Sequence, residues 1–400
     1  MSGTLRIGLV YDDTVDRPGG IGLYVTTLGA ALSRRGHHVE YLLGTSQRRS
    51  IDALPAHALA RNVRVRFNGN VLSMPAWSRA SHLDRALTCA RFDVLHVQVP
   101  YSPLMAGRLL DRCDNRCAVV GTYHVASDHL VPRAGALALR AFAHRWDRRF
   151  DRMLAVSETA ARFARQYSRL RIDDIAPNLL DASAFRAQAH GGARAEHPQG
   201  SADVVFVGRL VPRKGVIHLL RAVAAIGRRP GNVMPRVAIL GDGPLRGQLE
   251  RASAGLGLGA HVTFLGAVDD ETKAAVLRRA TIACFPSLFG ESFGMVILEA
   301  LAAGAQVVLG GDNPGYRELL GDDRALVDPC DEDAFADRLH GLLTSSDLRA
   351  SVGRAQRDRM RRFDVETVTD QVEQAYHLAL QRRRSSRSIP AASETGLAMV

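Results

Sequence analysis

Short apolar and β-branched runs alternate with Ala-, Leu- and Arg-rich stretches along the first half of the chain. Apolar runs of this length indicate buried strands, and the longer stretches between them indicate helices. The predicted strands cover residues 5–11, 38–43, 63–67, 94–99, 118–124 and 152–156. Strands joined by helical crossovers predict a parallel sheet with helices on both faces.

The alternation stops in a Gly-, Pro- and polar-rich stretch at residues 186–201 and then starts again. The second set of predicted strands covers residues 203–208, 236–240, 261–265, 282–285, 306–309 and 325–327. We therefore predict an α/β protein with two doubly wound, Rossmann-like domains, at residues 1–185 and 202–363, joined by a linker at 186–201. A helix at 364–380 and a basic disordered tail at 381–400 are expected to follow.

The composition agrees with a protein of this size and class. A chain of 400 residues that is 46% hydrophobic can fill two cores. The longest apolar runs carry charges, as Glu299 shows, and none reaches the roughly 18–20 residues of a membrane span. The apolar run at residues 5–10 is shorter than a secretory segment, so we expect a cytoplasmic protein. The five cysteines form no paired C-x-x-C units and are expected to be reduced.

Charge points toward a phosphate-containing ligand. Lys and Arg exceed Asp and Glu by 52 − 41 = 11, which favours attraction to phosphates without naming the kind. Arg209 and Lys214 directly follow the predicted strand at 203–208, and two fixed cations at a strand end suit a diphosphate. A solvated surface pair would give the same pattern.

Two carboxylates follow the predicted strand at 282–285. Glu291 lies in a Gly-punctuated turn, and Glu299 interrupts the apolar helix that this turn opens. Free N–H groups at the start of such a helix would face an anion, and carboxylates can accept hydrogen bonds from a sugar and a ribose. Each acid alone could also be structural, Glu291 through the helix dipole and Glu299 through backbone hydrogen bonds.

The order of these motifs resembles the retaining glycosyltransferases of the GT-B fold, the large bacterial family of mannosyl- and glucosyltransferases. The matching C-terminal motifs are Gly208-Arg209, Lys214-Gly215, Gly241-Asp242-Gly243-Pro244 and Glu291-Ser292-Phe293-Gly294 with Glu299. In the first half, Pro18-Gly19-Gly20, Asn68-Gly69-Asn70-Val71 and His124 also match, so the likeness covers about residues 5–380. Within the family, the chain is most similar to the mannosyltransferases of phosphatidyl-myo-inositol.

The resemblance implies a role for each matching residue of the donor site. Arg209 and Lys214 would bind the diphosphate, Glu291 the sugar, and Glu299 the ribose. Gly20 would let the backbone approach the phosphate, and His124 would bind the transferred sugar. The start of the following helix would hold the phosphates through Ser292, Phe293, Gly294 and Met295. Guanine would be contacted by Val268, Asp270 and Lys273.

The expected reaction is the transfer of a hexose, mannose from GDP-mannose, with retention of configuration to a lipid or glycan acceptor. The resemblance implies front-side attack with His124, Arg209, Lys214 and Glu291 as the catalytic residues. No metal or other cofactor is expected to be required, since the fixed cations would take the place of Mg²⁺.

The likeness to the phosphatidylinositol enzymes fails where the acceptor is expected. Val125 follows the histidine where those enzymes carry Thr, Asp13 stands where they have a tyrosine, and Ser73 replaces an arginine after Asn68. A phosphoinositol head would thus lose a cation and meet a carboxylate. The acceptor stays open, with a phosphatidylinositol-like lipid among the candidates.

Residues 140–150 mix aromatic side chains with several cations. As a helix, they could lie on the anionic inner face of the cell membrane. A solvated helix face is the alternative. Nucleic acid is not expected as a partner, because no basic recognition element appears.

Other functions fit parts of the pattern. A glycosyltransferase that uses a UDP-sugar and a soluble acceptor would need the same cations and acids, and so would a non-catalytic nucleotide-sugar binding protein. A nicotinamide-dependent dehydrogenase fits less well, because Gly20 and Gly22 form a damaged G-x-G-x-x-G and Glu40 lies inside its strand.

Overall fold

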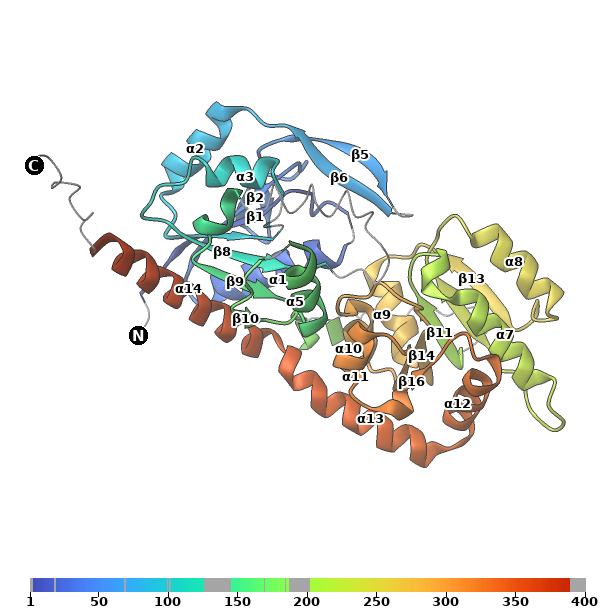
Figure 1. Ribbon diagram of the computed structural model, residues 1–400. Helices are drawn as coiled ribbons and strands as arrows, with labels where there is room; N and C mark the ends of the chain where they lie inside the picture. The colour runs from blue at the N-terminus through green and yellow to red at the C-terminus, as the bar shows by residue number, and fades with distance from the viewer. Residues whose placement is uncertain are drawn as a thin grey trace, which may run out of the picture.

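The computed structural model describes residues 3–17, 19–67, 70–98, 100, 102–125, 145–168, 170–183, 185–186 and 202–388. Two α/β domains, each built on a mainly parallel sheet, lie side by side in Figure 1. The predicted fold class is therefore confirmed. None of the helices in the described ranges is long and apolar enough to cross a bilayer.

The N-terminal sheet has eight strands in the order β10-β9-β8-β7-β1-β2-β4-β3, parallel except for the β3–β4 pair. The strands are β1 (Arg6–Tyr11), β2 (His38–Leu43), β3 (Ser50–Ile51), β4 (Leu54–Ala58), β7 (Val94–Val97), β8 (Ala118–Tyr123), β9 (Arg152–Ala155) and β10 (Asp174–Ile175). The helices are α1 (Gly20–Arg34), α2 (Ala80–Ala90), α3 (Met105–Leu110) and α5 (Glu158–Phe163).

The prediction that residues 63–67 join the parallel sheet is wrong. They belong to β5 (Arg61–Phe67), which pairs antiparallel with β6 (Asn70–Trp77) in a separate two-stranded hairpin that projects from the domain (Figure 1). Only two residues separate the strands, which is too short a connection for a parallel crossover but suits a hairpin.

The C-terminal sheet has six parallel strands in the order β13-β12-β11-β14-β15-β16. They are β11 (Val204–Val207), β12 (Val237–Leu240), β13 (Val262–Gly266), β14 (Ile282–Phe285), β15 (Val307–Gly311) and β16 (Leu326–Val327). The helices are α7 (Val216–Gly227), α8 (Arg246–Gly255), α9 (Asp270–Arg279), α10 (Met295–Ala303), α11 (Pro314–Leu320), α12 (Glu332–Thr344) and α13 (Ser346–Met360).

The strand order reverses at one place in each sheet, between β1 and β7 and between β11 and β14. Chain connections leave such a point in opposite directions, so a crevice opens beyond the carboxyl ends of the two strands. Asp13 follows β1, Lys214 follows β11 and Glu291 follows β14, whereas Val268 follows β13 at the edge of its sheet.

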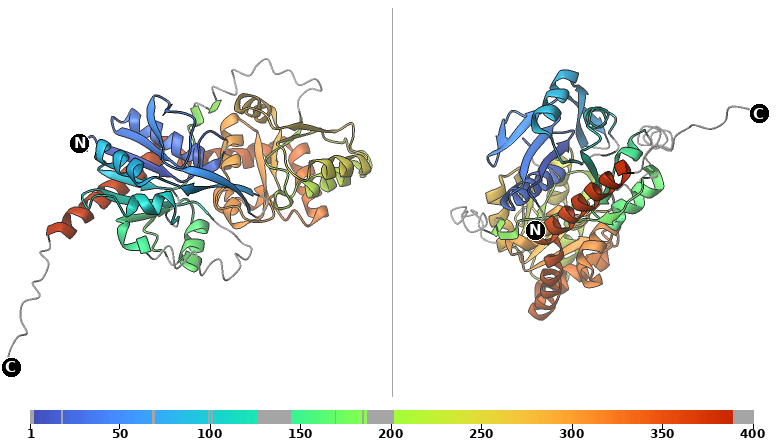
Figure 2. Two further views of the ribbon diagram at one scale, coloured as in Figure 1. Left: turned by 90° about the horizontal axis from the view of Figure 1, so that it is seen from above. Right: turned by 90° about the vertical axis from the view of Figure 1, so that its left-hand side faces the viewer.

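The last helix, α14 (Val365–Ser388), crosses from the C-terminal domain along the N-terminal domain (Figure 2). Val368, Val372 and Tyr376 are buried in one cluster with Val120 and Leu154 of the N-terminal sheet. At the edge of this contact one guanidinium bonds to three acids of α14, with Arg35 donating to Glu366, Asp370 and Glu373.

The predicted start of the disordered tail at residue 381 is wrong for residues 381–388, which continue α14. Arg382 donates to the carbonyl of Asp151, and Arg383 lies 2.8 Å from the Asp151 carboxylate. These contacts with the N-terminal domain stabilise the last helical turns. Residues 389–400 and most of the predicted linker lie outside the described residues.

Candidate active site

The loops that follow β11 and β14 lie against each other at the switch point of the C-terminal sheet. Gly215 has φ of 68°, and a Cβ there would stand 1.9 Å from the carbonyl oxygen of Pro286. Only glycine fits such a left-handed position against a neighbouring backbone. The loop that carries Lys214 is thereby held next to the loop that leads to Glu291.

Glu291 joins two cations in this loop. Its Oε1 accepts from Lys214 Nζ at 2.7 Å and from Arg213 Nη1 at 2.8 Å, and its side chain is 11% exposed. Burial favours the neutral acid, but the charges on Lys214 and Arg213 outweigh it and lower the pKa of Glu291 below its ordinary value. The group is therefore a carboxylate with two fixed cations beside it.

The structure thus brings Lys214 and Glu291 together from positions 77 residues apart. Arg209 lies exposed two residues beyond the end of β11. Arg213, which the sequence analysis passed over, bonds to the same carboxylate oxygen as Lys214. Its place beside Lys214 was the signal that could have found it.

Helix α10 begins in this loop and faces the start of α1 across the two domains. Met295 is the first residue of α10, and a Cβ on Gly20, the first residue of α1, would lie 3.6 Å from Met295 Cγ. Gly294, with φ of 119°, packs its backbone on the ring of Tyr316. Two helix N-termini therefore converge, and their free N–H groups favour an anion between them.

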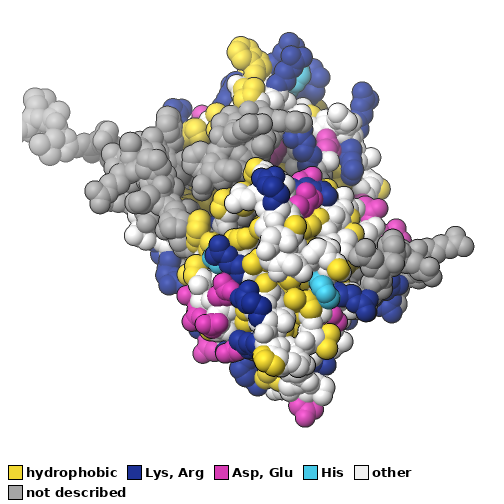
Figure 3. Space-filling view, turned by 90° about the vertical axis from the view of Figure 1, so that its right-hand side faces the viewer, with side chains coloured by type: hydrophobic (Ala, Val, Ile, Leu, Met, Phe, Trp, Pro, Cys, Tyr) yellow, Lys and Arg dark blue, Asp and Glu magenta, His cyan; other side chains and the backbone are white. Residues whose placement is uncertain are grey.

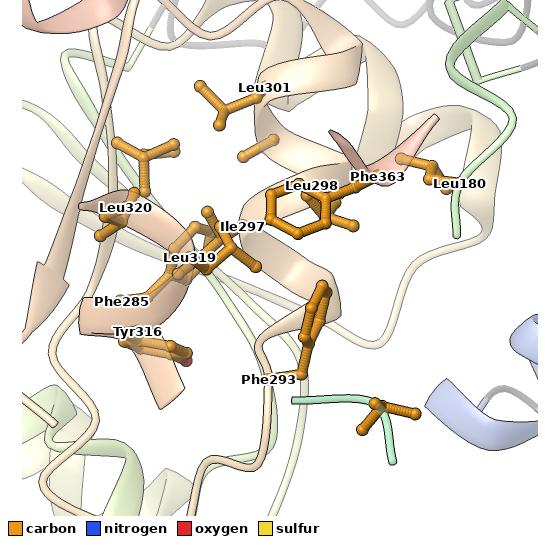
Figure 4. Packing of buried hydrophobic residues seen from close by; sticks show 14 of the residues in the cluster. Leu180, Phe285, Phe293, Ile297, Leu298, Leu301, Tyr316, Leu319, Leu320 and Phe363 are labelled. Atoms are coloured by element: carbon orange, nitrogen blue, oxygen red, sulfur yellow. The ribbon is translucent and has the colours of Figure 1, made fainter. Parts of the chain in front are cut away.

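Phe293 and Ser292 of the same loop have other partners. The ring of Phe293 is buried and meets Phe363 edge-to-face at 5.3 Å, near Leu180 (Figure 4). The carbonyl of Ser292 accepts from Ser157 Oγ of the N-terminal domain at 2.5 Å. The Phe293 side chain is thus part of the packing between domains, and only its backbone remains for a donor contact.

The residues predicted to contact base and ribose also come together. Lys273 Nζ lies 2.9 Å from Asp270 Oδ1 and 3.1 Å from Glu299 Oε2, and 5.5 Å above the ring of Phe185. Burial raises the pKa of Glu299, and the charge on Lys273 offsets only part of this rise. Val268 lies half-buried just before the Asp269 cap of α9.

His124 stands at the end of β8 in an uncharged setting. Its Nε2 lies 2.9 Å from Gln98 Oε1, and its ring meets Tyr24 edge-on at 5.0 Å. Burial lowers the pKa of His124 to about 3. The imidazole is therefore neutral at physiological pH and can accept or donate a hydrogen bond without carrying charge.

The residues predicted for the acceptor come from different elements: Asp13 follows β1, Ser73 lies in β6 and Val125 follows β8. Asp13 Oδ1 accepts from the Thr14 backbone at 2.7 Å, and Ser73 Oγ accepts from Asn62 Nδ2 at 3.0 Å. The same Asn62 amide donates to the carbonyl of Asp12 at 2.9 Å, which connects the hairpin to the end of β1. Val125 packs against the core, and Asn68 lies outside the described residues.

A contact between the domains was not predicted and adjoins the donor loop. The Glu318 carboxylate of α11 accepts from the backbone N–H groups of Glu158 at 2.8 Å and Thr159 at 3.1 Å, at the N-terminus of α5. Ser157, which bonds to Ser292, is the N-cap of α5. No sequence motif marks these residues, because the contact depends on the docking of two domains.

Two further observations concern metal-ligand side chains and Glu40. In the described part of the chain, no three His, Cys, Asp or Glu side chains gather as metal ligands would. Glu40, which a dehydrogenase would use for a ribose, lies 2.8 Å from His57 Nε2.

Comparisons with known proteins agree with this geometry. The family model "Glycosyl transferases group 1" matches residues 193–359, and "Glycosyltransferase Family 4" matches residues 18–177. The phosphatidyl-myo-inositol mannosyltransferase of Mycolicibacterium smegmatis is 31% identical over 93% of both chains. A GDP-mannose-dependent alpha-(1-6)-phosphatidylinositol monomannoside mannosyltransferase of the same organism is 28% identical over 87% of this chain and 92% of its own.

Among solved structures, a glycosyltransferase from Rickettsia africae superimposes with a TM-score of 0.72 at 14% identity, over 95% of this chain and 100% of its own. That likeness shows the fold, whereas the identity to the mannosyltransferases shows the family. The family assignment overturns the dehydrogenase alternative. The chain belongs to the group 1 glycosyltransferases of the GT-B fold and is a glycosyltransferase.

Proposed function

We propose that this enzyme transfers mannose from GDP-mannose, with retention of configuration, to a lipid or glycan acceptor. The mannosyltransferases named above support the sugar and, in one case, the donor. The observation that carries the proposal is the cluster of Lys214, Arg213 and Glu291 beside the first turn of α10. It combines cations for a diphosphate, N–H groups for its oxygens and a carboxylate for sugar hydroxyls.

The first step is donor binding. The leaving diphosphate would lie between the starts of α1 and α10, with Lys214 and Arg209 supplying positive charge. Lys214 already stands at a fixed position through Glu291, so little reorganisation precedes the reaction. Glu299 would accept from the ribose hydroxyls, and Asp270 would accept from the ring N–H and exocyclic amine of guanine.

The transfer step breaks the bond between the anomeric carbon and the diphosphate oxygen. The acceptor hydroxyl attacks from the same face, its oxygen bonds to the anomeric carbon, and its proton passes to the leaving phosphate oxygen. The products are the mannosylated acceptor and GDP. Lys214, Arg209 and the helix N-termini stabilise the charge that grows on the diphosphate, and no metal ion is needed for this purpose.

A donor panel tests this proposal. GDP-mannose, UDP-glucose and ADP-glucose are compared by thermal shift, and mannosyl transfer is followed with radiolabelled donor to phosphatidylinositol vesicles and soluble glycans, with and without EDTA. We expect stabilisation by GDP-mannose, transfer that survives EDTA, and a product with the donor's anomeric configuration by NMR. Stabilisation by UDP-glucose alone, or an inverted product, would overturn the assignment, and binding without transfer to any acceptor would indicate a binding protein.

The β5–β6 hairpin supports contact with a membrane. Val63, Met74 and Trp77 are 51%, 39% and 69% exposed on it, with Val63 paired to Met74 and Arg61 paired to Trp77 across the strands. Exposed aromatic and aliphatic side chains beside a cation suit the interface of an anionic bilayer. At the end of the C-terminal domain, basic and acidic side chains are interspersed with hydrophobic ones over the face that Figure 3 shows.

A matched pair of variants tests the hairpin. Trp77→Ser removes its largest exposed apolar side chain, and Val233→Ser removes one that is 88% exposed in the other domain, between α7 and β12. On vesicles that contain phosphatidylinositol, we expect Trp77→Ser to reduce co-sedimentation and Val233→Ser to leave it unchanged. Equal binding of both variants and the parent would contradict a role of the hairpin.

A further inference from the structure

A buried polar network runs beneath the N-terminal half of the site. His96 Nδ1 lies 2.8 Å from Tyr376 Oη of α14, and His96 Nε2 lies 2.6 Å from Thr122 Oγ1. Two residues farther along the same strands, Gln98 and His124 form the pair at 2.9 Å. Gln98 follows β7 and is 0% exposed, whereas His124 follows β8 and is 6% exposed.

We propose that Gln98 is a positioning residue that holds His124 in the tautomer with its proton on Nε2, so that Nδ1 is the acceptor for a hydroxyl of the transferred sugar. The inference rests on the proposed function of His124 in sugar binding. Gln98 itself acts through His124.

The orientation of the Gln98 amide in the structure, with Oε1 toward the ring, sets the direction of the hydrogen bond. The amide oxygen of Gln98 can only accept, so His124 Nε2 must carry the proton that it donates, and a neutral imidazole then has its lone pair on Nδ1. In the other tautomer the Nε2 lone pair would face the amide oxygen. That arrangement would lose the hydrogen bond in a site where water cannot replace it.

A neutral partner suits this task better than a carboxylate. A glutamate at position 98 would stabilise the imidazolium and remove the acceptor at Nδ1. The groups that face His124 in the described structure are Tyr24 from α1 and Gln98 and His96 near the end of β7. His96 is itself held neutral by burial, so none of these neighbours brings charge to His124.

The second polar atom of Gln98 is also informative. Its Nε2 is buried and has no hydrogen-bond partner among the described residues. An unpaired buried donor costs about 1–3 kcal/mol, and an apolar side chain of similar length would avoid that loss. Rotating the amide by 180° would turn this Nε2 toward His124 and require the ring proton on Nδ1, so the tautomer of His124 reports which end of the amide faces the ring.

The tautomer can be measured without any substrate. Protein labelled with ¹⁵N-histidine is examined by NMR between pH 5 and 8, and the spectrum of His124→Asn assigns the His124 signals. We expect Nε2 to be protonated and Nδ1 to show the shift of an unprotonated ring nitrogen over the whole range. An Nδ1-protonated ring, or titration within this range, would overturn the proposal.

Two variants separate positioning from simple packing. Gln98→Met removes the amide at similar length and is expected to mix the tautomers and lower kcat about 3–10-fold, while GDP binding is unchanged. Gln98→Glu keeps an acceptor on Nε2, so we expect nearly full activity at high pH and a new loss of activity as pH falls. A flat pH profile in Gln98→Glu, or an unmixed tautomer in Gln98→Met, would overturn the proposal.

The experiments also separate a failure of the proposed function of His124 from a failure of the positioning role of Gln98. If His124 keeps the expected tautomer but His124→Asn transfers mannose normally, the positioning holds and the sugar-binding role of His124 is wrong. Circular dichroism establishes that each variant is folded, and Gln98→Asn, which keeps an amide on a shorter side chain, should restore part of the single-tautomer signal.

Discussion

The two halves of the candidate site are built from different interactions. In the C-terminal domain, the buried carboxylates Glu291 and Glu299 each bond to a lysine. Across the site, His124 and Gln98 are buried with neutral partners. Charge pairs suit the proposed binding of a diphosphate, whereas neutral groups could orient the proposed sugar without competing for the phosphates. The halves should therefore respond to different perturbations.

Removing one cation from the C-terminal half should have the largest effect. Lys214→Ala is expected to lower kcat by about 10²–10³, the range for losing one preorganised charge-stabilising donor. It also leaves Glu291 with Arg213 as its remaining cation. Steady-state mannosyl transfer from GDP-mannose measures the change.

The control for this prediction is Arg228→Ala, which removes an exposed cation paired with Glu332 in the same domain. Its kcat should stay near that of the parent enzyme. Near-normal turnover of Lys214→Ala would instead assign the charge stabilisation to other groups, and the contrast between the halves would lose its main support.

Acid should affect the N-terminal half first. Burial lowers the pKa values of His96 and His124 from 6.5 to about 3, so the unfolded chain binds two protons that the folded chain does not. Their stabilisation is fully present above pH 6.5 and is lost as pH falls from there toward 3. Between pH 7 and 5 the free energy of unfolding should drop by about 4 kcal/mol from these two groups.

In the other half, burial raises the pKa of Glu291, but the charges on Lys214 and Arg213 outweigh this effect and lower the pKa below 4.5. Its stabilisation is present above pH 4.5 and is lost only below that value. Urea unfolding of the parent and of His96→Asn at several pH values measures the difference, with a shallower loss expected for the variant. Equal slopes between pH 7 and 5 would show that His96 binds its proton in the folded state too.

The same contrast explains what could be predicted from the sequence. Lys214 and Glu291, which the structure brings together, could be singled out because each follows the end of a predicted strand. Gln98 was missed because a single amide in an apolar run carries no pattern. The strand predicted at residues 63–67 was misassigned because its β-branched residues also suit a parallel sheet. Their alternation with Arg is instead typical of a half-exposed strand, as the pairing with β6 shows.

Weakening the base and ribose cluster should have a smaller effect than removing Lys214. Lys273→Met keeps the length of the side chain but removes the charge that Asp270 and Glu299 share. The loss of one charged hydrogen bond should raise the Kd for GDP about tenfold. Isothermal titration with GDP and with inorganic pyrophosphate separates the two parts of the site, because pyrophosphate affinity should not change. Equal weakening for both ligands would place Lys273 on the phosphates.

The smallest effect is expected where the two halves meet. Glu318→Ala removes the carboxylate that accepts from the N-terminus of α5 and leaves Ser157 on Ser292 as a neighbouring contact. Since the carboxylate is partly exposed, its loss should lower kcat/KM only about 2–5-fold.

If the Glu318 carboxylate holds the domains together, the radius of gyration from X-ray scattering should rise in the donor-free variant and return toward the parent value with GDP-mannose. Glu332→Ala, which removes a surface acid within one domain, should change neither quantity. A Glu318→Ala variant that scatters as the parent does but is slower would mean that the contact acts through the donor loop at Ser292, and the two halves would then be coupled locally and not by domain closure.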